Sequence, residues 1–224
     1  MADEKPWLKY YGDVPASLDY PRVTMYEALM RSVERNPEAI AYDFMGYTST
    51  YRRFAAEIDQ CARALYALGL RKGERITISM PTTPQGIICF YGANKIGAVA
   101  SMIHPLSTAK EIAFYLRISK SRFALTIDAF YNKFREIREE TPLEVLILTK
   151  ISDYLEFIKK IGFYLTKGRK IPPVPADPMV RWWKETMSAS YPPVPEVPMD
   201  TDELAVIPYS GGTTGTPKGI MLSN

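Results

Sequence analysis

The stretch RITISMPTTPQGIICFYGANKIGAVASMI, residues 75–103, decides the fold class of this 224-residue chain. It opens with an apolar segment, 75–80, and closes with a second one, 98–103, and a segment of helical character starts near Pro84 between them. The apolar run 87–103 is interrupted by Asn94 and Lys95. We therefore interpret it as a buried helix that passes into a buried strand, rather than as a membrane span.

The same alternation continues towards the C-terminus. A second helix is expected over 108–119, a third strand over 123–127, a third helix over 131–140 and a fourth strand over 145–148. Strands that alternate with helices at this spacing predict an α/β fold with a largely parallel sheet and flanking helices. In such sheets, ligands bind beyond the carboxyl ends of the strands.

The residues before this alternation predict two helices and a hairpin. Thr24 followed by Glu27 forms a capping box, and the helix that it starts should end at Asn36. A short hairpin is expected over 39–51, with Thr50 as the cap of a second helix that ends near Gly69.

The pattern changes after Thr149. Residues 153–170 predict an amphipathic helix, with Leu155 and Ile158 on its apolar face, and five basic and no acidic side chains lie between Phe157 and Lys170. Such a segment suits either peripheral contact with an anionic membrane or simple solvation. Eight of the 18 prolines lie between 172 and 198, which is typical of a linker rather than a sheet. We therefore divide the chain into 1–149, a basic and proline-rich excursion over 150–202, and a strand, loop and strand over 203–224.

Composition limits the classes of function. Hydrophobic residues make up 46% of the chain and its net charge is +3, which fits a globular protein and gives no indication of a nucleic-acid partner. Cys61 and Cys89 lie in apolar segments, so we expect two buried thiols in a reducing compartment. No secretory signal is visible at the start, and a cytoplasmic location is expected, with peripheral membrane contact as a further option. His104 is expected to have a structural or rim role.

The segment YSGGTTGTPKG, 209–219, has the composition of a phosphate-binding loop. Its three glycines let the backbone turn sharply and direct amides at an anion, and Lys218 adds a positive charge. A P-loop NTPase would need glycine before that lysine and Ser or Thr after it, where this chain has Pro217 and Gly219. A dinucleotide fingerprint would need glycine at Ser210, and a KH loop joins two helices rather than following a strand. A glycine-rich hairpin without a ligand remains the structural alternative.

This segment resembles the signature phosphate loop of the adenylate-forming (AMP-binding) superfamily, which includes acyl-CoA and aryl-CoA synthetases. Residues 48–85 and 90–116 resemble the first two conserved blocks of that family. The resemblance implies that a carboxylate attacks the α-phosphate of ATP with Mg²⁺, and that coenzyme A then displaces AMP from the acyl-adenylate. The loop would hold the β- and γ-phosphates, with no catalytic or metal-binding residue assigned. The residues implied at this site are Ser210, Gly211, Gly212, Thr213, Thr214, Gly215, Thr216 and Lys218.

Within the superfamily, the excursion after Thr149 resembles that of long-chain fatty acyl-CoA synthetases. The resemblance implies a fatty acid or another carboxylate, ATP and CoA as substrates. The adenine-binding, magnesium-binding and hinge segments of the family follow the loop, so we expect this chain to be an N-terminal fragment that is inactive without the C-terminal half. The alternatives are a non-catalytic nucleotide-binding module, half of a split adenylate-forming enzyme, or an aryl or medium-chain acyl-CoA ligase.

Overall fold

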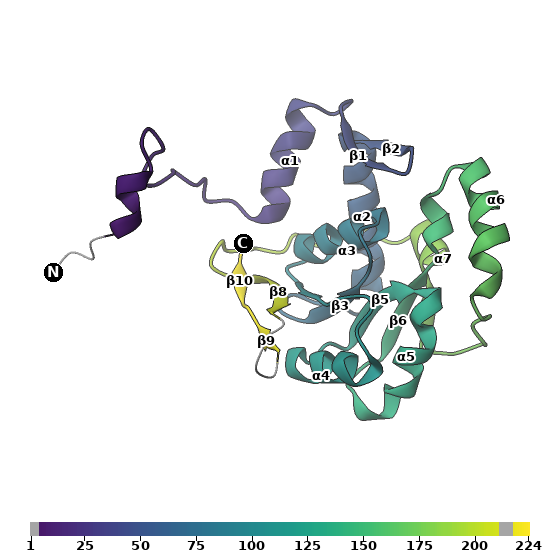
Figure 1. Cartoon of the computed structure of the whole chain (residues 1–224). Helices are drawn as coiled ribbons and strands as arrows, with labels where there is room; N and C mark the ends of the chain where they lie inside the picture. The colour runs from purple at the N-terminus through teal and green to yellow at the C-terminus, as the bar shows by residue number, and fades with distance from the viewer. Residues whose placement is uncertain (1–4, 211–216) are drawn as a thin grey trace.

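The computed structural model of the protein describes residues 5–210 and 217–224, and its centre is a twisted sheet (Figure 1). The sheet has the order β10-β8-β4-β3-β5-β6-β7, and β9 pairs with β8. All neighbours from β8 to β7 are parallel, which confirms the predicted α/β class. The strands are β3 (Arg75–Ser79), β4 (Val99–Met102), β5 (Phe123–Ile127), β6 (Val145–Thr149), β7 (Val180–Trp182), β8 (Leu204–Ser210), β9 (Lys218–Gly219) and β10 (Leu222–Ser223).

Helices cover both faces of the sheet (Figure 1). Successive side chains of a strand point to opposite faces, and β5 shows the result: Phe123 and Leu125 enter one apolar cluster and Ala124 the other. The first cluster is closed by α2 (Tyr51–Ala67), α3 (Pro84–Lys95) and α7 (Trp183–Ser188), and the second by α4 (Ala109–Ser119) and α5 (Tyr131–Glu136).

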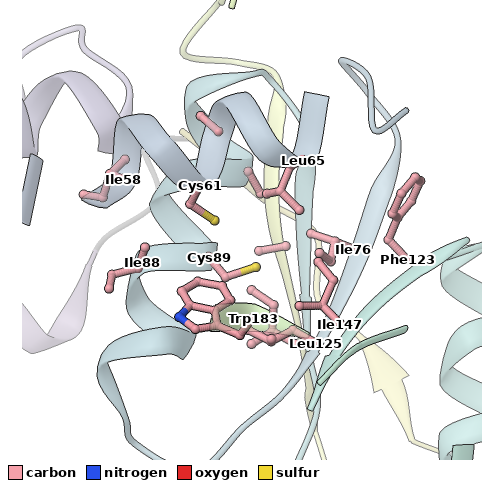
Figure 2. Packing of buried hydrophobic residues seen from close by; sticks show 14 of the residues in the cluster. Ile58, Cys61, Leu65, Ile76, Ile88, Cys89, Phe123, Leu125, Ile147 and Trp183 are labelled. Carbon is pink, nitrogen blue, oxygen red and sulfur yellow. The ribbon is translucent and has the colours of Figure 1, made fainter. Parts of the chain in front are cut away.

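The first cluster contains both cysteines, each buried and free, as expected from the sequence (Figure 2). Figure 2 places Cys61 of α2 and Cys89 of α3 between the helices, above the indole of Trp183. A hydrogen bond with Cys89, together with burial, raises the pKa of the Cys61 thiol well above its usual value. Both buried side chains pack as small apolar groups.

The N-terminal elements follow the predicted boundaries. Thr24 caps α1 (Met25–Arg35): its backbone N–H donates to Glu27 Oε2 at 2.7 Å, and its Oγ1 accepts from the Glu27 N–H at 3.1 Å. The hairpin of β1 (Ile40–Phe44) and β2 (Tyr47–Thr50) leads into α2, where Thr50 accepts from the Arg53 N–H at 3.3 Å. The preceding 3-10 helix η1 (Pro6–Tyr10) lies away from the sheet (Figure 1).

Three predictions for the later part of the chain were wrong in detail. The proline-rich segment contributes a strand, because β7 pairs in parallel with β6. The helix expected over 131–140 is interrupted at Ile137, whose side chain is buried in the second cluster. The amphipathic helix α6 (Phe157–Thr166) begins after Leu155, which is itself buried. The remaining 3-10 turns are η2 (Asp128–Phe130), η3 (Arg138–Glu140), η4 (Ile151–Tyr154) and η5 (Gly168–Lys170).

Close contact between α2 and α3 depends on Gly92. A Cβ atom at this position would lie 3.0 Å from Cys61 Sγ and 3.1 Å from Cys61 Cβ, so a larger side chain overpacks the helix interface. We expect Gly92→Val to lower the free energy of unfolding by about 2 kcal/mol in urea denaturation. The matched control is Gly162→Val in α6, because no atom lies within 4 Å of a Cβ there. The control should change stability by less than about 0.5 kcal/mol, and equal losses in both variants would contradict the proposed packing.

Candidate functional site

The two ends of the predicted phosphate loop lie side by side at the carboxyl edge of the sheet. Strand β8 runs parallel to β4, in the register Ala100 to Val206 and Met102 to Pro208, so it ends at the same edge. Beyond β4, β8 pairs with β9 in antiparallel register, Ser210 opposite Lys218. The chain therefore leaves and re-enters the sheet through one cross-strand pair, although the single second strand that the sequence predicted is divided into β9 and β10.

Both residues of this pair are exposed. Ser210 brings a hydroxyl group and Lys218 an ammonium group to one point at the base of the loop, and these groups suit an anion such as phosphate. Gly211, Gly212, Thr213, Thr214, Gly215 and Thr216, which the sequence also assigned to the site, lie outside the described residues.

Tyr209 anchors the end of β8. Its Oη lies 3.0 Å from Ser101 Oγ on β4, within hydrogen-bond distance. Its ring packs at 4.4 Å, centroid to centroid, from that of Tyr115 on α4, whose phenol has a pKa raised by burial. A half-buried residue held on two sides fixes the position from which the loop departs.

Gly219 fits against the same tyrosine from the opposite strand. A Cβ atom at Gly219 would lie 3.0 Å from Ile207 Cγ2 and 3.2 Å from Tyr209 Cε1. A larger residue after Lys218 would therefore require Ile207 and Tyr209 to shift, which gives the glycine of the Pro-Lys-Gly exit a packing reason.

The segment between β4 and α4 forms the neighbouring rim. His104 is exposed there, and its Nδ1 accepts from the Leu106 N–H at 3.2 Å, which agrees with the expected rim role. Lys133 of α5 donates to the Ser107 carbonyl at 2.7 Å. Thr108 then caps α4 with Glu111, and its backbone N–H lowers the pKa of the Glu111 carboxyl group. The rim is therefore held by hydrogen bonds to α5 and by the N-terminal cap of α4.

The arrangement can hold an anion, but the described residues offer no obvious metal site. Within residues 5–210 and 217–224, no three His, Cys, Asp or Glu side chains group together in a way that could hold a metal ion. Ser210 and Lys218, the site residues that the structure describes, fit phosphate oxygens.

Comparison with known proteins assigns this chain to a family. The profile described as AMP-binding enzyme matches residues 29–224, which is most of the chain and includes both the loop and its two strands. The chain belongs to the AMP-binding enzyme family. The predicted resemblance to adenylate-forming enzymes is thereby confirmed.

The proteins similar to this chain include CoA ligases of more than one type. The long-chain-fatty-acid–CoA ligase of Bacillus subtilis is 30% identical over 229 residues, covering 100% of this chain but 41% of the relative. A solved anthranilate CoA ligase in complex with anthranoyl-AMP has a TM-score of 0.75 at 21% identity, covering 92% of this chain and 36% of that one. A long-chain-fatty-acid-CoA ligase from Archaeoglobus fulgidus has a TM-score of 0.70 at 20% identity, covering 92% and 38% respectively.

The chain therefore spans about two fifths of the length of the family members that it matches, in their N-terminal part. The solved structures share its fold, which confirms the predicted N-terminal portion of the adenylate-forming fold.

Some residues that shape the site were missed by the sequence prediction. Ser101, Tyr115 and Lys133 support the loop and its rim from β4, α4 and α5. In the sequence, Tyr115 is one of several apolar residues in the helix expected over 108–119, and nothing there indicates a contact with the loop. Its partner Tyr209 becomes a neighbour only when β8 is placed beside β4.

We expect Tyr209→Phe to lower the free energy of unfolding by about 1 kcal/mol, because Ser101 Oγ loses its partner while the ring packing stays. Urea denaturation followed by circular dichroism measures the change. The control is Tyr164→Phe on α6, where the side chain is 62% exposed and stability should not change. An unchanged Tyr209→Phe variant would show that this hydrogen bond does not anchor β8.

Proposed function

We propose that the chain forms the N-terminal part of an ATP-dependent acyl-CoA ligase, with a long-chain fatty acid as the carboxylate substrate. The observation that carries this proposal is the Ser210 and Lys218 pair, which closes the loop base at the carboxyl edge of the sheet in an AMP-binding family chain. Exposed lysine and serine side chains also occur on ligand-free hairpins, so the proposal rests on this pair together with the family match.

In the proposed reaction, the loop binds the β- and γ-phosphates of ATP while the carboxylate attacks the α-phosphate. Lys218 attracts the leaving pyrophosphate, and the Ser210 hydroxyl donates to a phosphate oxygen. Donors held in place before reaction stabilise the transferring group without reorganising. Mg²⁺, when bound, would neutralise phosphate charge, and CoA supplies the thiol that releases AMP.

The long-chain substrate is supported by the Bacillus subtilis relative, whose name states that class. Similarity to an anthranilate CoA ligase supports an aryl substrate instead. Two further functions fit the same fold, namely half of a split adenylate-forming enzyme and a non-catalytic nucleotide-binding module. By itself the chain is expected to be inactive.

Lys218→Ala tests the assignment in a ligase polypeptide that contains this chain. Loss of the phosphate clamp should reduce carboxylate-dependent ATP–pyrophosphate exchange by about 100-fold. Thioester formation from supplied acyl-adenylate should fall much less, because no pyrophosphate leaves in that step. The matched control is Lys184→Ala, an exposed lysine of α7.

Two outcomes would change the proposal. A larger loss in thioester formation than in exchange would remove Lys218 from the adenylation step. Faster exchange with benzoate or 4-coumarate than with palmitate would replace the long-chain substrate by an aryl one.

We further propose that residues 153–170 contact the surface of an anionic membrane. The outward apolar side chains of α6 are strongly exposed, Phe157 at 77%, Ile158 at 82% and Leu165 at 60%. The helix lies at the periphery of the protein (Figure 1). In the described part of the chain, no helix is both long enough and apolar enough to cross a bilayer. Exposed apolar and basic side chains on one short helix suit binding at the interface instead.

Removing the three basic residues that follow α6 tests this contact. Each lysine or arginine near an anionic surface contributes about 1 kcal/mol, so the triple variant Lys167→Gln, Arg169→Gln, Lys170→Gln should bind phosphatidylglycerol vesicles about 100-fold more weakly. Vesicle co-sedimentation measures the binding, with Lys184→Gln as the control. Equal binding of the triple variant and the original chain would show that the basic run is merely solvated.

A further inference from the structure

A cavity lies at the opposite end of the carboxyl edge from the phosphate loop. Its volume is about 570 Å³, within the usual range of small-molecule sites. It is bounded by residues at the ends of β5, β6 and β7, namely Asp128, Lys150 and Trp182, and is closed by α6 and the turn after it. Ligands collect at this edge of parallel sheets, so the position suits a binding site.

The cavity exists because α6 stands away from the sheet. All 10 residues of α6, which the structure describes in full, are exposed or half-buried. Its inner side presents Ile161, Phe163 and Tyr164 to the cavity. The returning segment adds Ile171 and Val174. These side chains form walls that suit a flexible apolar body rather than a polar ligand.

Two lysines give one part of the cavity a positive charge. Lys150 and Lys160 both contribute to the lining, against one acidic residue, Asp128. Lys150 Nζ lies 5.2 Å from the centroid of the Trp182 ring, a cation–π distance that holds the ammonium group at the mouth of the apolar wall.

Neither Lys150 nor Lys160 takes part in an ion pair within the described residues, although Lys150 has an acidic neighbour in the cavity, Asp128. Within the described residues, the lysines found in ion pairs are Lys72, Lys95 and Lys159. Lys159 illustrates the contrast, because it points to the β1–β2 hairpin, where it donates to the Met45 carbonyl. The neighbouring Lys160 lines the cavity instead.

We propose that this cavity binds a single-chain amphiphile with one anionic head group, the head at Lys150 and Lys160 and the chain along Ile161, Phe163 and Trp182. The site is separate from the phosphate loop, because β6 and β8 are four strands apart, or about 20 Å. This proposal goes beyond the ligase function and does not depend on it.

Direct binding to the 224-residue chain tests the proposal without ATP or CoA, so that its failure leaves the ligase assignment untouched. Palmitate and hexadecyl phosphate, each kept below its micelle concentration, are titrated while tryptophan fluorescence is followed. Saturable binding is expected for at least one of them, and the comparison tells a carboxylate head from a phosphate head. The signal should disappear in Trp182→Phe, because Trp182 lines the cavity.

Charge and shape are tested by variants. The double variant Lys150→Gln, Lys160→Gln should bind about 100-fold more weakly, since two charged hydrogen bonds are lost. The matched control Lys170→Gln removes a charge of the same basic run that does not line the cavity, and it should bind normally. Val174→Trp should block binding by filling the cavity while circular dichroism confirms an intact fold.

Three results would overturn the proposal. Equal affinity for uncharged hexadecanol would remove the role of the lysines. Unchanged binding in both the double-lysine variant and Val174→Trp would place the ligand elsewhere. A fluorescence change with phosphatidylglycerol vesicles but with neither free amphiphile would identify a membrane surface instead of a cavity.

Discussion

The structure depends on the parallel pairing of β8 with β4. A buried side chain secures it: Asn94 Nδ2 donates to the Ala205 carbonyl at 3.2 Å. This bond places the start of β8 beside the last turn of α3, and the register then brings Tyr209 to Ser101. The Tyr209 anchor and the paired ends of the loop, which together form the candidate phosphate site, both depend on this register. A shift of one residue would turn Tyr209 to the opposite face of the sheet.

Side-chain hydrogen bonds between neighbouring elements hold the carboxyl edge of the sheet together. Polar side chains lie at the ends of successive strands and bond to their neighbours, as when Thr126 Oγ1 donates to the Ser79 carbonyl at 3.0 Å. Gln85, buried near the start of α3, donates to Thr149 Oγ1 and to the Lys150 carbonyl, each at 3.0 Å. Buried polar networks of this kind favour one arrangement over others. These bonds therefore position the strand ends from which the phosphate loop departs and which line the cavity under α6.

Sequence reasoning succeeded where the determinants are local. Thr24 and Thr50 bond within their own first turn, so capping patterns located both helices. The apolar runs of β3 to β6 and the glycine-rich loop between two strands were likewise visible in short windows. Sequence reasoning failed where residues far apart in the chain determine the local structure. Strand β7 is only three residues long and exists as a strand because it pairs with the edge of β6. Ile137 interrupts a helical pattern because the second apolar cluster buries its side chain. The partners of Tyr209 are equally invisible without the fold.

Strand β8 is synthesised long after the strand beside which it pairs, β4. Asn94 and Ala205 are 111 residues apart, so β8 joins the sheet across a long chain closure, whereas β3 to β6 connect through successive short crossovers. Long-range contacts form slowly because the chain entropy is lost before they contribute. On a ribosome, the α/β body can assemble while β8 is still being synthesised. The candidate phosphate site should therefore form after the scaffold of β3 to β6, in which the β4 edge is unpaired until β8 joins it.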